Sequence, residues 1–107
     1  MEKIESISNI FIEKMKNRYG ERLSKVVLYG SYARGDQHEE SDIDFMIILN
    51  DSTLQPEKVG IVGQLITEIK EQFNVLISIL PVTIDRYMFS DRLFYKNVRR
   101  EGIVIYE

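Results

Sequence analysis

Residues 26–49 read VVLYGSYARGDQHEESDIDFMIIL, in which two apolar runs enclose a polar loop. The first run ends at a Gly30-Ser31 turn, whose small residues leave backbone amides free to donate to phosphate oxygens. The second run begins around Asp42 and Asp44, which share one face of a strand because side chains alternate between faces. Two carboxylates roughly 7 Å apart repel one another unless a cation lies between them. The stretch therefore predicts a joint site for a metal ion and a phosphate.

The composition is that of one soluble domain, and we expect a single domain over residues 1–107 in the cytoplasm. Of the 107 residues, 44% are hydrophobic and 29% are charged, and no apolar run approaches the roughly 20 residues of a membrane span. The charged amino terminus does not resemble a signal peptide. The absence of cysteine excludes disulfides and thiolate metal sites. A net charge of -3 argues against a general nucleic-acid binder.

The hydrophobic pattern predicts an α/β or α+β fold in the order α-β-β-α-β-α-β, a mixed sheet with helices mainly on one face. The expected elements are a helix over 4–19, strands over 25–28 and 42–49, a helix from Pro56 to Phe73, a strand over 75–80 stopped by Pro81, a short turn capped within 83–85, a helix capped by Ser90 or Asp91 and running to about Arg100, and an edge strand over 103–106.

With Gly30-Ser31, ten intervening residues and Asp42-x-Asp44, the chain resembles the minimal nucleotidyltransferases (MNT type) of the DNA polymerase β-like superfamily. The ending RREGIVIY, residues 99–106, is also similar. The resemblance implies a nucleotidyltransferase-like sheet in which both aspartates are catalytic and bind Mg²⁺, while Gly30 and Ser31 hold the triphosphate of ATP. Without the resemblance, the glycine and serine are an ordinary turn and the aspartates are solvated residues at a strand start.

Arg34, Gly35 and Ser41 complete the predicted nucleotide-binding set. The Arg34 guanidinium either steadies phosphates or the acceptor, or forms an internal salt bridge to Asp36 or Asp42. Gly35 serves the geometry of the loop, and Ser41 either orients Asp42 or caps the strand entry.

The third strand departs from the family pattern. Active members of the superfamily have a third carboxylate there, whereas residues 75–80 read VLISIL. Ser78 or Leu76 occupies the corresponding place, depending on register, and we include Ser78 among the candidate catalytic residues. A serine hydroxyl is no base near neutral pH without help. Asp85 reaches the site only if its loop folds over it, and His38 is expected to be solvated.

Two classes of function remain open. By resemblance, the chain is an antitoxin that transfers AMP from ATP to a tyrosine of a HEPN-domain ribonuclease, because no second domain is present to hold a small acceptor. The alternative is a degenerate module that binds nucleotide, or only its toxin, without turnover. Bulky residues near the carboxyl end either pack the last helix or form a face for a partner or a second copy: Tyr87, Met88, Phe89, Leu93, Phe94 and Tyr95. Basic residues there form a solvated face or contact an acidic partner: Arg92, Lys96, Arg99 and Arg100.

Overall fold

The structure, a computed structural model, describes residues 2–38, 41–54 and 59–107. A 3-10 turn, Gly20–Arg22, joins the first helix to the first strand. The other elements are α1 (Glu2–Tyr19), β1 (Leu23–Tyr29), α2 (Ser31–Arg34), β2 (Ile43–Leu49), α3 (Val59–Phe73), β3 (Ile77–Thr83), α4 (Ile84–Phe89), α5 (Leu93–Glu101) and β4 (Ile103–Tyr106).

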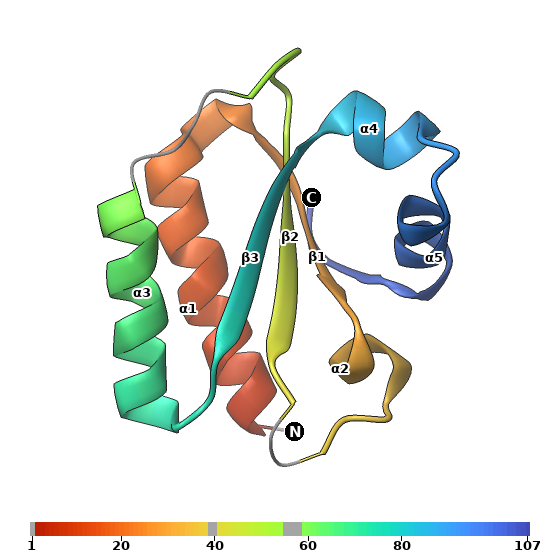
Figure 1. Cartoon of the computed structure of the whole chain (residues 1–107). Coiled ribbons are helices and arrows are strands. Elements are labelled where there is room, and N and C mark those ends of the chain that lie inside the picture. The colour runs from red at the N-terminus through yellow and green to blue at the C-terminus, as the bar shows by residue number, and fades with distance from the viewer. Residues whose placement is uncertain (1, 39–40, 55–58) are drawn as a thin grey trace.

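The four strands form one mixed sheet in the order β3-β2-β1-β4 (Figure 1). β1 is antiparallel to β2 and to β4, whereas β3 is parallel to β2. The register places Asp44 of β2 between Tyr29 of β1 and Ser78 of β3. The two predicted carboxylates therefore lie at the amino-terminal end of a central strand.

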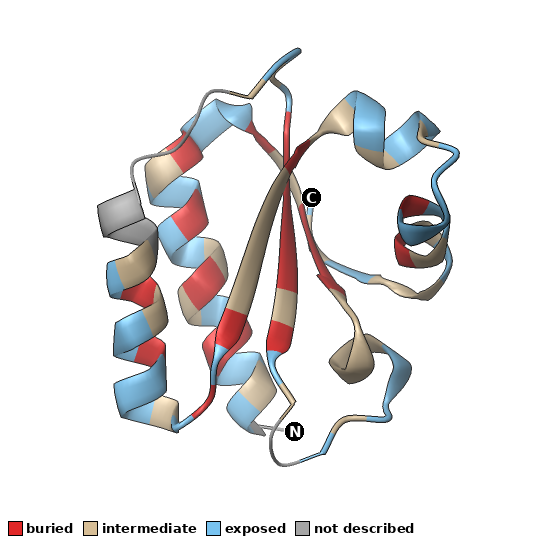
Figure 2. Cartoon of the chain, in the orientation of Figure 1, coloured by how far each residue is buried: buried red, intermediate tan, exposed pale blue. Residues whose placement is uncertain are grey.

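The face of the sheet under the two long helices holds the larger part of the core. Alternate residues of β2, from Ile43 to Leu49, pack there against buried side chains of α1 and α3. The rings of Phe11 and Phe45 stack with centroids 4.1 Å apart. Figure 2 shows buried positions recurring along α1 and α3, which is the pattern of helices with one face against a sheet.

The opposite face is covered by the shorter helices α4 and α5 (Figure 1), which refines the predicted arrangement of helices on mainly one face. Met46 and Ile48 point to this side and pack with Tyr95 and Val98 of α5. Because side chains alternate along β2, Asp44 points to the same side. The short helices cover only part of this face. The end of the face at Asp42 and Asp44 is accessible, since Asp42 is exposed and Asp44 is half-buried.

Several predicted boundaries are wrong. The third strand runs from Ile77 to Thr83 and includes Pro81, which was expected to stop it. Proline is tolerated because β3 is an edge strand, where a missing N–H costs no ladder bond on the outer side. The polar loop after Gly30 contains the additional helix α2.

The capping predictions near the carboxyl end have mixed outcomes. Thr83 caps α4 as expected, its hydroxyl accepting from the backbone N–H of Arg86. Neither Ser90 nor Asp91 caps α5, whose N-cap residue is Arg92. The Ser90 hydroxyl instead accepts from the Arg92 N–H at 3.3 Å, within the connection before the helix. Gly102 ends α5 and β4 follows as the expected edge strand, whereas Pro56 lies outside the described residues.

No helix within the described ranges combines the length and the apolar character that crossing a membrane requires.

Candidate active site

The turn after β1 brings the backbone against a carboxylate. Gly30 has φ +76, a conformation that side chains strongly disfavour, and it precedes the single turn of α2. A Cβ at this position would collide with the carboxylate of Asp44. The first helical bonds run from the N–H groups of Ala33 and Arg34 to the Gly30 carbonyl, both at 3.1 Å. The amides of Ser31 and Tyr32 therefore precede the first intrahelical bond.

We expect Gly30→Ala to lower the stability of the fold and the affinity for Mn²⁺ much more than Gly35→Ala does. Both glycines have positive φ, but an added Cβ at Gly35 meets nothing within 4 Å. The backbone cost of about 1–2 kcal/mol is therefore common to both variants, and only Gly30→Ala also displaces Asp44. Urea unfolding and Mn²⁺ titration check this: equal losses of metal affinity in the two variants would contradict the role given to Gly30.

The two aspartates lie close enough to repel one another. Asp42 is exposed just before β2, and Asp44, the second residue of β2, is half-buried. Burial, then the charge of Asp42, raises the pKa of the Asp44 carboxyl above its usual value, and Arg34 only partly opposes this shift. Within the described ranges no three His, Cys, Asp or Glu side chains gather into a metal site. Two carboxylates nevertheless suit Mg²⁺, which keeps several waters and takes further oxygens from phosphates.

We expect Asp44→Asn to raise the Tm of the metal-free protein at pH 7. A raised folded-state pKa means that the ionised carboxylate destabilises the fold, at any pH above that pKa. The gain in Tm from asparagine should shrink as the pH falls from the raised pKa of the folded protein towards the pKa of Asp44 in the unfolded chain. Below that pH the carboxyl is protonated in both the folded and the unfolded state. Thermal unfolding between pH 7 and pH 3.5 with a chelator measures it, and a gain that grows on acidification would contradict the assignment.

The register resolves which residue stands in the third-strand position. Ser78 pairs with Asp44, whereas Leu76 lies before β3 and its carbonyl accepts from the Ile43 N–H at 2.9 Å. The Ser78 hydroxyl lies near enough to the Tyr29 phenol to oppose the rise in the pKa of that phenol, so the two side chains approach one another over β2. Burial and the nearby Asp44 charge raise the pKa of this phenol, which keeps it protonated.

Sequence reasoning missed Tyr29 as a member of this site. Strand alternation was the available signal, since Tyr29 shares the face of Val27, which packs in the cluster under α5. Asp85 lies far from the site, because β3 runs parallel to β2 and its last residue, Thr83, pairs with Leu49. That places Asp85 beyond the opposite end of the sheet, roughly 17 Å or more from Asp44 at 3.3 Å per residue.

The remaining predicted residues shape the loop beside the turn. Arg34 pairs with Asp36 at 3.1 Å, as one of the two alternatives proposed, and lies 3.7 Å from Glu101 of α5. Gly35 caps α2 with φ +80, consistent with a geometric role. The Ser41 hydroxyl accepts from the N–H of His38 at 2.9 Å and so fixes the approach to Asp42. Binding of nucleotide by Arg34, Gly35 and Ser41 stays a prediction.

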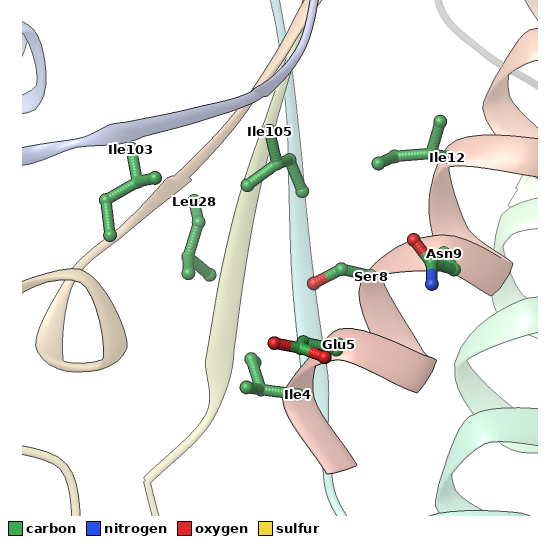
Figure 3. Close-up of a pocket in the computed structure, with 8 residues that line it drawn as sticks. All are labelled: Ile4, Glu5, Ser8, Asn9, Ile12, Leu28, Ile103 and Ile105. Atoms are coloured by element: carbon green, nitrogen blue, oxygen red, sulfur yellow. The ribbon is translucent and has the colours of Figure 1, made fainter. Parts of the chain in front are cut away.

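A pocket of about 200 Å³ adjoins the turn. It lies between the end of β1 and one side of α5, and its lining comprises Tyr29, Gly30, Arg34, Phe94, Asn97, Val98 and Glu101. A second, larger groove of about 530 Å³ lies between α1 and β4 (Figure 3). Neither lining includes an aspartate, but the smaller pocket is bordered by Gly30, whose backbone lies against the Asp44 carboxylate. We therefore place the candidate site at the smaller pocket and the adjoining carboxylates.

The sequence matches a family model and two curated proteins over most of its length. Residues 8–104 match the model of the nucleotidyltransferase domain. "Putative protein adenylyltransferase MJ0604" of Methanocaldococcus jannaschii is 36% identical over 104 residues, covering 90% of this chain and 91% of that protein. "Putative protein adenylyltransferase MJ0141" of the same organism is also 36% identical, over 73% of this chain and 77% of that protein.

Solved structures support the same fold at lower identity. A toxin-antitoxin crystal structure with AMP-PNP superposes with a TM-score of 0.59 at 19% identity, covering 89% of this chain and 69% of that chain. A complex of the tri-AMPylated Shewanella oneidensis HEPN toxin with an MNT antitoxin superposes with a TM-score of 0.56 at 16% identity, covering 95% of this chain and 71% of that chain. These likenesses confirm the mixed sheet with the MNT arrangement. Together with the match over residues 8–104, they confirm the resemblance noted in the sequence: the chain belongs to the nucleotidyltransferase domain family.

Proposed function

We propose that this protein is a Mg²⁺-dependent nucleotidyltransferase that transfers AMP from ATP to another protein. The observation that supports this most strongly is the contact between the Gly30 backbone and the Asp44 carboxylate. The turn whose first amides make no intrahelical bond thus lies directly beside a pair of carboxylates that repel one another. Phosphoryl and nucleotidyl transfers need positioning and charge neutralisation more than covalent help, and this arrangement offers both.

In this proposal, each described residue has a distinct task. Asp42 and Asp44 hold Mg²⁺, which when bound neutralises phosphate charge and polarises the attacked phosphorus. The amides of Ser31 and Tyr32 donate to the triphosphate, and Gly30 allows its close approach. Arg34 exchanges its exposed partners for phosphate oxygens, which its planar guanidinium suits.

The reaction is a displacement at the α-phosphorus of ATP. The acceptor hydroxyl oxygen forms the new bond, the bond to the β-phosphate oxygen breaks, and pyrophosphate leaves while the hydroxyl proton passes to solvent. A neutral Ser78 and a protonated Tyr29 flank Asp44, so neither supplies a base at neutral pH.

The acceptor that we propose is a HEPN-domain toxin in the cytoplasm, which this protein neutralises as an antitoxin. The relatives bear the name "putative protein adenylyltransferase", and one structural neighbour is an MNT antitoxin in complex with an AMPylated HEPN toxin. A second candidate is neutralisation by binding alone. The serine in place of a third carboxylate favours it, because the residues that the structure describes then offer the metal two carboxylates and no third.

Intact mass spectrometry separates the two candidates. The protein is incubated with ATP, Mg²⁺ and the HEPN-domain protein encoded beside its gene, with an EDTA control. A partner mass increased by one or more AMP units, in the Mg²⁺ sample only, supports transfer. A stable complex with an unchanged partner mass supports neutralisation by binding. A genome that encodes no HEPN protein in the neighbourhood would contradict both antitoxin roles.

A further inference from the structure

Four large apolar side chains project into solvent on the α4–α5 side of the sheet, and one of them, Phe94, lines the pocket of the candidate site. They come from α4 and the start of α5, and we call them the α4–α5 surface: Met88, Phe89, Leu93 and Phe94. Phe89 and Leu93 are each 71% exposed, and the other exposed large apolar side chains in the described part of the chain are less so. Figure 2 shows exposed positions along α4 and the segment that leads into α5. Solvent exposure of neighbouring bulky residues is typical of an interaction site.

The backbone beneath this surface is held in place rather than loose. The guanidinium of Arg99, partly buried, donates to the Tyr87 carbonyl at 2.7 Å and to the Ser90 carbonyl at 2.8 Å. Both bonds fix the turn between α4 and α5. On the other side of α5, Tyr95 and Val98 are buried against the sheet. Leu93 and Phe94 are therefore presented outward by a fixed helix, which lowers the entropy that a partner must remove on binding.

The surface continues into the active site. The ring of Phe94 contacts that of Tyr29 edge to face, with centroids 5.7 Å apart, and Tyr29 pairs with Asp44. Phe94 also lines the 200 Å³ pocket beside Gly30. Phe94 therefore belongs both to the α4–α5 surface and to the pocket, so a protein bound over Leu93 and Phe94 lies next to the pocket.

The charges around the surface indicate the chemistry of its occupant. Residues 84–101 contain five basic and three acidic side chains, whereas the whole chain has a net charge of -3. Arg86, Arg92 and Lys96 are exposed at its border. Complementary charge directs encounter and disfavours wrong partners, so an occupant with carboxylates around an apolar centre fits best.

We propose that the α4–α5 surface is the docking site for the acceptor protein. The acceptor contributes apolar side chains flanked by carboxylates, and its binding there delivers the hydroxyl to the pocket beside Asp44. This inference rests on the proposed transfer to a protein, and it specifies where that protein binds.

The test compares two double variants in binding and in transfer. Phe89→Ser with Leu93→Ser removes the two most exposed side chains of the surface. Ile103→Ser with Val104→Ser is the matched control, since these residues are 47% and 41% exposed but lie on β4. Calorimetry measures affinity for the HEPN-domain protein of the mass experiment, and mass spectrometry measures transfer. Mg²⁺-ATP binding and Tm report whether each variant is intact.

We expect the surface variant to bind the partner at least about thirtyfold more weakly and to transfer correspondingly less, with nucleotide binding unchanged. The control should match the wild type. Transfer by the surface variant at the wild-type rate and affinity overturns the docking site but leaves the enzyme. If the wild type binds the partner but transfers no AMP, and the surface variant no longer binds, the docking site is supported and the enzyme is refuted. A wild type that neither binds nor transfers refutes both. If the wild type and the control variant are dimers and the surface variant is a monomer, the occupant of the surface is a second copy of this chain, which would overturn the proposal.

Discussion

Replacing Asp42 and Asp44 together by asparagine is expected to abolish Mg²⁺-dependent nucleotide binding while the protein stays folded. The amide has the shape of the carboxylate but is a much poorer ligand for a hard cation. Loss of the metal removes several kcal/mol of charge stabilisation, so AMP transfer should fall at least about 10³-fold. Calorimetry with ATP and Mg²⁺, and the rate of partner modification, measure the two losses.

A second double variant controls for charge. Asp85→Asn with Asp91→Asn makes the same change in net charge at exposed positions on α4 and before α5. It should bind Mg²⁺-ATP as the wild type does. Equal loss in both double variants, or unchanged binding in the first, would exclude the metal site.

Replacing Ser78 by aspartate is expected to strengthen metal binding. Ser78 pairs with Asp44 on the adjacent parallel strand, so the new carboxylate joins the two that are present. An added charge at this distance should tighten Mn²⁺ binding about tenfold, equivalent to about 1.4 kcal/mol. The same charge should lower the Tm of the metal-free protein, because three carboxylates then repel one another. We therefore expect a larger rise of Tm with Mn²⁺, together with faster transfer.

Ser78→Asn is the matched control, since it changes the size of the side chain without adding charge. If Ser78→Asp and Ser78→Asn respond to Mn²⁺ alike, the third-strand position is not part of the metal site. If only the aspartate variant transfers AMP, the natural protein acts by binding alone.

The sequence predicted the part of the site that is local along the chain. Gly30, Asp42 and Asp44 lie within a short stretch of two strands and a turn, and strand alternation predicts one face for both carboxylates. The structure begins β2 at Ile43, so Asp42 lies just before the strand, yet close enough for its charge to act on Asp44. The resemblance predicted the family, and the family match confirms it. The hydrophobic spacing likewise predicted the long helices, because apolar residues spaced three or four apart share one face in a helix but not in a strand.

The contributions from distant segments were not predictable in this way. The sequence does not give the bounds of the third strand, because proline commonly ends a strand, whereas an edge strand such as β3 tolerates Pro81. The register that sets Ser78 beside Asp44 depends on how β3 meets β2, and no local pattern encodes it. Glu101 and Phe94 reach the pocket only because α5 packs across the sheet through Tyr95 and Val98.

A crystal structure grown with Mn²⁺ and AMP-PNP tests the central claim most directly. We expect an anomalous scattering peak between the carboxylates of Asp42 and Asp44, with phosphate oxygens against the amides that follow Gly30. A manganese peak elsewhere, or AMP-PNP bound in the groove between α1 and β4 and absent from the turn, would contradict the account.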